Sequence, residues 1–83
     1  MLNRMVSMRI EITDIGLTAT LLCLGFSIKD IDRSNAKRVV FVFEDSLEVQ
    51  KIISEYQRDA VICPAQSLLS SLKRAKHILY DYQ

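Results

Sequence analysis

The strongest hydrophobic signal in the chain is a run of five apolar residues at positions 39–43, all of them β-branched or aromatic. A basic residue precedes the run and two acidic residues follow it. This composition predicts a β-strand over 38–44 with apolar side chains on both of its faces. Alternation places the two phenylalanines on one face, and Val40 and Val42 on the other. A small domain can cover one such face with its own helices, but the second face needs another layer or another molecule.

A partner strand is predicted immediately before this one. Residues 26–32 read as the first strand of a β-hairpin, and 34–37 as the turn. A four-residue turn places Ile28 on the face of the phenylalanines, and it also brings Asp30 and Asp32 to that face. A five-residue turn moves Ile28 to the valine face instead, because one slip in register exchanges the two faces. We prefer the four-residue turn because it gathers the aromatic rings.

Three segments have apolar residues at the spacing of an amphipathic helix: 14–24, 46–57 and 64–81. Thr13 is the expected N-cap of the first helix and Asp45 that of the second. Pro64 suits the first position of the third helix. Gly25 is the expected C′ residue of the first helix, where a positive φ turns the chain away. Gly16 costs about 1 kcal/mol relative to alanine inside that helix, which indicates close packing against it.

Three short segments have weaker patterns. Residues 8–12 alternate between apolar and charged, which predicts either a short strand or an extended lead-in to the first helix. Residues 60–63 are apolar and are followed by a proline, which predicts a third short strand. Residues 1–7 are expected to form a poorly ordered arm. Three methionines are alternative starts of the chain: Met1, Met5 and Met8.

These elements predict an α+β domain of order (β)αββα(β)α, with a small antiparallel sheet built on a β-hairpin and three helices. The chain has 83 residues, 49% hydrophobic and 25% charged, so we expect one folded domain over 8–83. The net charge of +1 gives no broad attraction to nucleic acid or to an anionic membrane. Apolar runs fall well short of the roughly 18 residues of a membrane span. Without a signal-peptide pattern, a cytoplasmic protein is expected.

The two cysteines, Cys23 and Cys63, lie in apolar stretches that are far apart in the sequence. This placement favours two reduced thiols in the core of a cytosolic protein. A single disulfide between them is the alternative, because the sequence does not supply the geometry that a disulfide needs.

Five short motifs follow one another along the chain: Thr13-Asp14, Gly25-Phe26, Phe41-Val42-Phe43-Glu44-Asp45, Tyr56 and Pro64. Their order resembles a family of short bacterial and phage domains of unknown function, over about residues 12–80. The resemblance implies a source in a phage or mobile element, and a protein that acts by binding host or phage macromolecules. The chain departs from the family in its longer N-terminal arm and in lacking small turn residues after Tyr56.

Catalytic chemistry has little support in the sequence. His77 is the only histidine, and it cannot by itself complete a Ser-His-Asp or Cys-His arrangement. Asp30 and Asp32 share a strand face and could bind a cation, but no further acid cluster or glycine loop accompanies them. We therefore expect no enzyme activity, no catalytic residue, no cofactor and no metal site.

Two groups of basic residues allow nucleic-acid binding as an alternative function. One lies on the hairpin and the other in the second half of the last helix: Lys29, Arg33, Lys37, Arg38, Lys73, Arg74 and Lys76. Converging groups could contact phosphates and make a small nucleic-acid-binding regulator. Acidic residues among the first group, and the lack of aromatic residues for stacking on bases, count against it.

Protein binding is the preferred function. Val40 and Val42, with Ile31 from the preceding strand, form the candidate interface on the second face of the hairpin, because exposed apolar patches mark interfaces. We expect a small interaction module that binds and modulates a protein partner, with a homodimer as the commonest symmetric solution.

Overall fold

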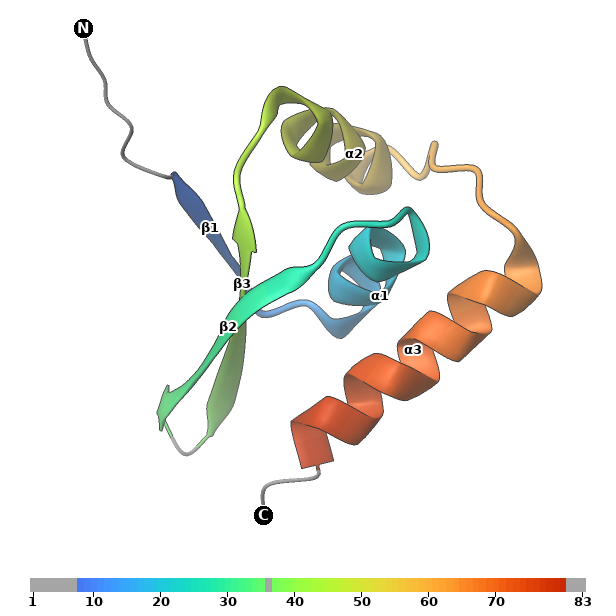
Figure 1. Cartoon of the computed structure of the whole chain (residues 1–83). Coiled ribbons are helices and arrows are strands. Elements are labelled where there is room, and N and C mark those ends of the chain that lie inside the picture. Colours follow the sequence, from blue (N-terminus) through green and yellow to red (C-terminus); the bar gives the residue numbers. More distant parts are fainter. Residues whose placement is uncertain (1–7, 36, 81–83) are drawn as a thin grey trace, which may run out of the picture.

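The structure, a computed structural model, describes residues 8–35 and 37–80. The arm expected over residues 1–7 lies outside this part of the chain. The elements follow one another as β1 (Arg9–Ile12), α1 (Ile15–Cys23), β2 (Ile28–Asn35), β3 (Arg38–Glu44), α2 (Leu47–Gln57) and α3 (Ala65–Tyr80). This order confirms the expected α+β class, with an antiparallel sheet and three helices (Figure 1).

β3 is the centre of the sheet, which has the order β1-β3-β2 with both pairings antiparallel. Residues 9–12 therefore form a strand rather than an extended lead-in. The helices lie to one side of the sheet, so the domain has two layers (Figure 1). Phe41 and Phe43 point into the space between the layers and are each only 1% exposed, as the strand pattern predicted.

The prediction of a third short strand over residues 60–63 is wrong. This segment has no regular structure and joins α2 to α3. Ile62 is 93% exposed, while Val61 and Cys63 are half-buried and line a hollow with Thr20 of α1 and Leu68 of α3. The segment thus lies in the helical layer, where no strand edge is available to pair with it.

α1 is the central element of the helical layer. Five consecutive residues, from Leu17 to Leu21, are buried, so the helix is covered on all sides. It packs against α3, α2 and β1, and Figure 1 shows it between the sheet and α3. Two of the buried residues are polar, but the hydroxyls of Thr18 and Thr20 donate to the carbonyl oxygens of Asp14 and Gly16 one turn earlier. Burial of these hydroxyls therefore leaves no donor unsatisfied.

The helix N-caps lie one residue later than expected. Asp14 rather than Thr13 caps α1, and its carboxylate accepts hydrogen bonds from two backbone N–H groups of the first turn, at 2.8 and 3.1 Å. Ser46 rather than Asp45 caps α2, and its hydroxyl accepts from the N–H of Val49 at 3.1 Å. Asp45 supports this turn from outside, because its carboxylate accepts from Ser46 N and Gln50 Nε2. Each cap stabilises its helix by about 1 kcal/mol.

Both α1 and α2 end in the same motif, with a residue of positive φ directly after the C-cap. Gly25, with φ of 98°, has this role after α1, as expected. Asp59, with φ of 59°, has it after α2, where glycine is the usual residue. The Asp59 N–H donates to Tyr56 O, and Ala60 N–H donates to Glu55 O, which completes a Schellman motif. The exit from α2 therefore needs no small residue, because aspartate tolerates this conformation better than most others.

We expect Asp59→Asn to raise the free energy of unfolding by about 0.3–1 kcal/mol. The aspartate places a negative charge beside the negative end of the α2 dipole. Asparagine removes that charge and also tolerates positive φ. Urea denaturation of both proteins at neutral pH and low salt measures the change, and a less stable variant would show that the carboxylate has a favourable role.

α1 and α2 approach each other closely at Gly16. A Cβ atom built on this glycine would lie 2.4 Å from the hydroxyl oxygen of Tyr56, so a larger residue would force the tyrosine to move. The Tyr56 hydroxyl donates to the carboxylate of Asp14 at 3.3 Å. Partial burial, and then the negative charge of Asp14 and this hydrogen bond, raise the pKa of Tyr56 above its usual value of 10.0. The close packing expected at Gly16 is confirmed.

The raised pKa of Tyr56 predicts a loss of stability in alkali. Because the phenol loses its proton more readily in the unfolded chain, this contribution is complete below pH 10 and disappears as the pH rises through the folded-state pKa. Tyr56→Phe should therefore lose less stability than the parent above about pH 10. Denaturation midpoints measured at neutral and alkaline pH test this, with Tyr80→Phe, at a 62% exposed position, as the control. Equal alkaline losses in the parent and in Tyr56→Phe would contradict it.

Candidate protein interface

The sheet face that points away from the helices is the candidate site. β3 contributes two valines to it, and the flanking strands contribute the residues that pair with them: Glu11 and Asp30 lie on either side of Val42, and Asp32 lies beside Val40. Arg9, two residues before Glu11, shares its face. We call this surface the outer face and define it by six residues: Arg9, Glu11, Asp30, Asp32, Val40 and Val42.

A β-bulge in β2 decides which residues reach the outer face. Ile28 pairs with Phe43, but Asp30 pairs with Val42, so the intervening Lys29 has no partner of its own in β3. From this point to Asp32 the faces of β2 are exchanged, and a second register shift follows between Asp32 and Asn35. Neither of the two uniform registers considered from the sequence is therefore correct.

The bulge places Ile31 on the helix side of the sheet. Ile31 pairs with Phe41 and packs against the hydrophobic core, as does Ile28. The expected grouping of Ile31 with Val40 and Val42 on one face is therefore corrected. The same exchange brings Asp30 and Asp32 to the outer face, although the preferred register had placed them beside the phenylalanines. Two isoleucines pack against the core, where they are partly buried, and two carboxylates reach solvent, which explains why the bulged register is favoured.

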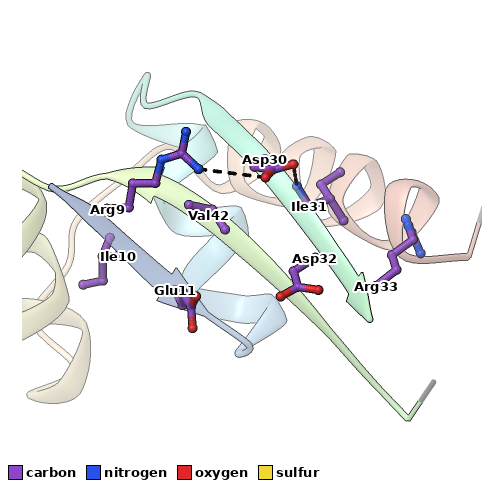
Figure 2. Close-up of a pocket in the computed structure, with 8 residues that line it drawn as sticks. All are labelled: Arg9, Ile10, Glu11, Asp30, Ile31, Asp32, Arg33 and Val42. Carbon is purple, nitrogen blue, oxygen red and sulfur yellow. Dashed lines mark hydrogen bonds and ion pairs between the residues drawn. The ribbon is translucent and has the colours of Figure 1, made fainter. Parts of the chain in front are cut away.

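Val42 is the apolar floor of the outer face, and it is only 5% exposed although none of the helices that the structure describes covers it (Figure 1). Charged side chains from the neighbouring strands cover it instead. Arg9 of β1 reaches across β3 toward Asp30 of β2, with Nη1 and Oδ2 3.9 Å apart, and Figure 2 shows Val42 between them. Both charged side chains are about 60% exposed, so this ion pair contributes less than about 1 kcal/mol. A binding partner could displace it at low cost.

The outer face is acidic. Among its six residues, three carboxylates, from Glu11, Asp30 and Asp32, outnumber one guanidinium, from Arg9. Alternation along β3 also brings Arg38 and Glu44 to this face, and their opposite charges leave the acidic excess unchanged. Hydrogen bonds from Ser34 lower the pKa of Asp32, and its Oδ1 accepts from the Ser34 N–H at 2.9 Å, so this carboxylate stays ionised under ordinary conditions. Residues of β1, β2 and β3 line an open hollow of about 590 Å³ here (Figure 2). A hollow with an apolar floor and an acidic rim suits a ligand that carries positive charge beside apolar groups.

The basic residues of the hairpin lie in different surroundings from one another. Arg33 is half-buried and donates to the carbonyl oxygens of Ile78, at 2.5 Å, and Leu79, at 3.4 Å, near the end of α3. A cation there is favourable because it offsets the negative end of the helix dipole. Lys29 lies at the bulge, while Lys37 and Arg38 are exposed beside the hairpin turn.

The basic residues of α3 lie on a different hollow. Lys73 and Arg74 line it together with His77 and the 63% exposed Leu69. Lys76 is exposed elsewhere on the same helix. Arg33 of the hairpin thus contacts α3, and its guanidinium donates hydrogen bonds to backbone carbonyl oxygens near the end of that helix.

Two other features that could indicate a function are a metal-binding cluster and a membrane-spanning helix. Within 8–35 and 37–80, no three histidine, cysteine or acidic side chains are close enough together to hold a metal ion. No helix in the described part of the chain is long and apolar enough to cross a membrane.

The sequence indicated the valines of the outer face but not its rim. In the sequence, Asp30 and Asp32 are possible cation ligands, and Arg9 and Glu11 are only the charged residues of a short alternating segment. The pairing of β1 with β3 brings these four side chains around Val42. The alternation over residues 8–12 was the available signal for β1, but it did not say which strand β1 would join.

Comparison with known proteins gives a match to one family model, described as a domain of unknown function (DUF5659), over residues 7–81. No curated protein and no solved structure matches the chain.

Proposed function

We propose that this chain, which belongs to the DUF5659 family of domains of unknown function, is a small non-enzymatic module that binds and modulates a protein partner through its outer face. The observation that carries the proposal is Val42, an apolar floor that no helix within residues 8–35 and 37–80 covers and that a displaceable ion pair shields from water. An apolar centre surrounded by a polar rim is typical of protein interfaces.

The charge of the outer face specifies the chemistry of the partner. Because carboxylates outnumber guanidiniums on it, the face suits a protein segment in which lysine or arginine flanks an apolar side chain. The apolar side chain would contact Val40 and Val42, and the basic groups would pair with Glu11 and Asp32. The motif resemblance supports a setting in which the domain is an accessory protein of a phage or mobile element in the host cytoplasm.

A peptide library displayed on yeast tests this proposal directly. Peptides selected on the full chain should carry basic residues beside apolar ones, and their affinity should fall as salt is raised. Glu11→Lys should weaken binding of the selected peptides at least about tenfold, which is about 1.4 kcal/mol. Glu48→Lys, the same charge change at an exposed position of α2, is the control and should bind as the parent does. Equal weakening by both variants, or selection of acidic peptides, would contradict the proposal.

A second copy of the chain is a poorer fit to this face than a basic partner. A symmetric dimer through the outer face would bring the carboxylates of both copies together, and like charges at an interface are unfavourable. We therefore expect sedimentation velocity at low salt to show a monomer. A dimer that Glu11→Lys changes would show instead that the partner is the chain itself.

A further inference from the structure

We propose that Cys23 and Cys63 form a reversible intramolecular disulfide, which ties the segment before α3 to the end of α1. Nothing in the outer face takes part in this, so the inference does not depend on the proposed function. Both cysteines are free thiols and half-buried in the structure. The bond would make the domain responsive to the redox state of its surroundings.

The fold brings the two cysteines together although 39 residues separate them in the sequence, positions 24–62. Cys23 is the last residue of α1, and Thr20 lies three residues earlier, on the same side of the helix. Thr20 and Cys63 line one hollow, with Tyr56 and Leu68. Cys63 therefore comes to the side of α1 that carries Cys23, and Figure 1 shows the segment between α2 and α3 passing the end of α1.

The pKa of Cys23 also indicates that the two cysteine side chains lie close together. Partial burial, and then the charge of Cys63 and a hydrogen bond between the two side chains, raise the pKa of Cys23 above its ordinary value of 9.0. A thiol exerts such an influence only on a close neighbour. Because the thiolate is the reactive form, disulfide formation should become faster as the pH rises.

A low-molecular-weight disulfide such as oxidised glutathione is a sufficient oxidant. Cys63 lines the open hollow, so its thiolate attacks one sulfur of the oxidant and a first glutathione thiolate leaves. The Cys23 thiolate then attacks the Cys63 sulfur of the mixed disulfide, and a second glutathione thiolate leaves. Two protein thiols are oxidised, one external disulfide is reduced to two thiols, and the two protons pass to the leaving thiolates.

The surroundings permit the bond to form. Cys63 lies in the irregular segment between α2 and α3, which can shift without breaking a helix or the sheet. The closed loop would contain β2, β3 and α2, and a long loop gives a large reduction in the entropy of the unfolded chain. For a domain of this size we expect oxidation to raise the thermal midpoint by at least about 10 °C.

Treatment of the full chain with oxidised glutathione, followed by intact mass measurement and thermal denaturation, tests this proposal. We expect the monomer to lose two hydrogens in mass and both titratable thiols, and its thermal midpoint to rise and then return after reduction. Cys23→Ser and Cys63→Ser should each gain one glutathione without a rise. A parent chain that gains two glutathiones, forms a covalent dimer, or keeps both thiols would overturn the proposal.

Discussion

Val42→Asp is expected to lower the free energy of unfolding by about 3–5 kcal/mol, because it places an unpaired carboxylate at a nearly buried position. Val42 is 5% exposed, and its direct cross-strand neighbours are Glu11 and Asp30. Like charges directly opposite each other destabilise a sheet. The new carboxylate would therefore face a like charge on each neighbouring strand and would compete with Asp30 for Arg9.

Val42→Lys is the matched variant, because it loses the same valine but gains a positive charge between two carboxylates. Opposite charges across strands are favourable, and the lysine stem can cover part of the sheet while its ammonium group reaches water. Urea denaturation should show that the lysine variant is clearly more stable than the aspartate variant, and that the difference shrinks in high salt. Similar stabilities of Val42→Asp and the parent would mean that the outer face has neither a buried floor nor an acidic rim.

Phe41→Ala is expected to cost about 3–5 kcal/mol, the usual range for removing a buried phenylalanine side chain. Phe41 is 1% exposed and lies in a core cluster with Leu21 and Val49, so the cavity would open between the sheet and α1. At about 0.05–0.15 kcal/mol per residue, a chain of 83 residues has about 4–12 kcal/mol of total stability. The substitution therefore removes a large share of it, and partial unfolding is expected at 37 °C.

Val40→Ala is the control for Phe41→Ala, since Val40 is the adjacent residue on the opposite face of β3 and is half-buried. Its loss should stay below about 1.5 kcal/mol. Urea denaturation monitored by circular dichroism measures both variants. Losses of equal size would contradict a domain whose core lies on the helix side of the sheet alone.

Local sequence was sufficient to predict the elements whose pattern has one interpretation. The bounds 38–44 of β3 were predicted as observed, because an uninterrupted run of β-branched and aromatic residues between charges has no helical alternative. The helix over 14–24 was found to within one residue at each end, and Gly25 was correctly assigned to its C′ position. These features depend on residues that are neighbours in the chain.

Features that depend on distant residues were not predictable in the same way. The β-branched residues of 60–63 favour a strand, but the segment lies in the helical layer beside α1, so tertiary placement outweighed propensity. The bulge at Lys29 had an indirect signal, because Ile28 and Ile31 can both face the core only when one extra residue lies between them. Reading that signal requires knowing that the helices cover one face only.

The outer face is another feature that depends on residues distant in the sequence. The sequence indicated two valines that need cover, and the expected cover was a second layer or another molecule. The structure supplies part of the cover from Arg9 and Asp30, which lie on strands at opposite edges of the sheet. Because the strand order β1-β3-β2 is set by tertiary packing, the acidic rim could not be derived from a linear pattern.

Amide chemical-shift mapping by NMR, with a library-selected peptide titrated into the full chain, tests the central claim that the outer face is the binding surface. We predict that the largest shifts fall on the strand segments 9–12, 30–32 and 40–42, and that the α3 segment 73–78 is unchanged. Largest shifts on α3, with the three strands unaffected, would contradict the claim.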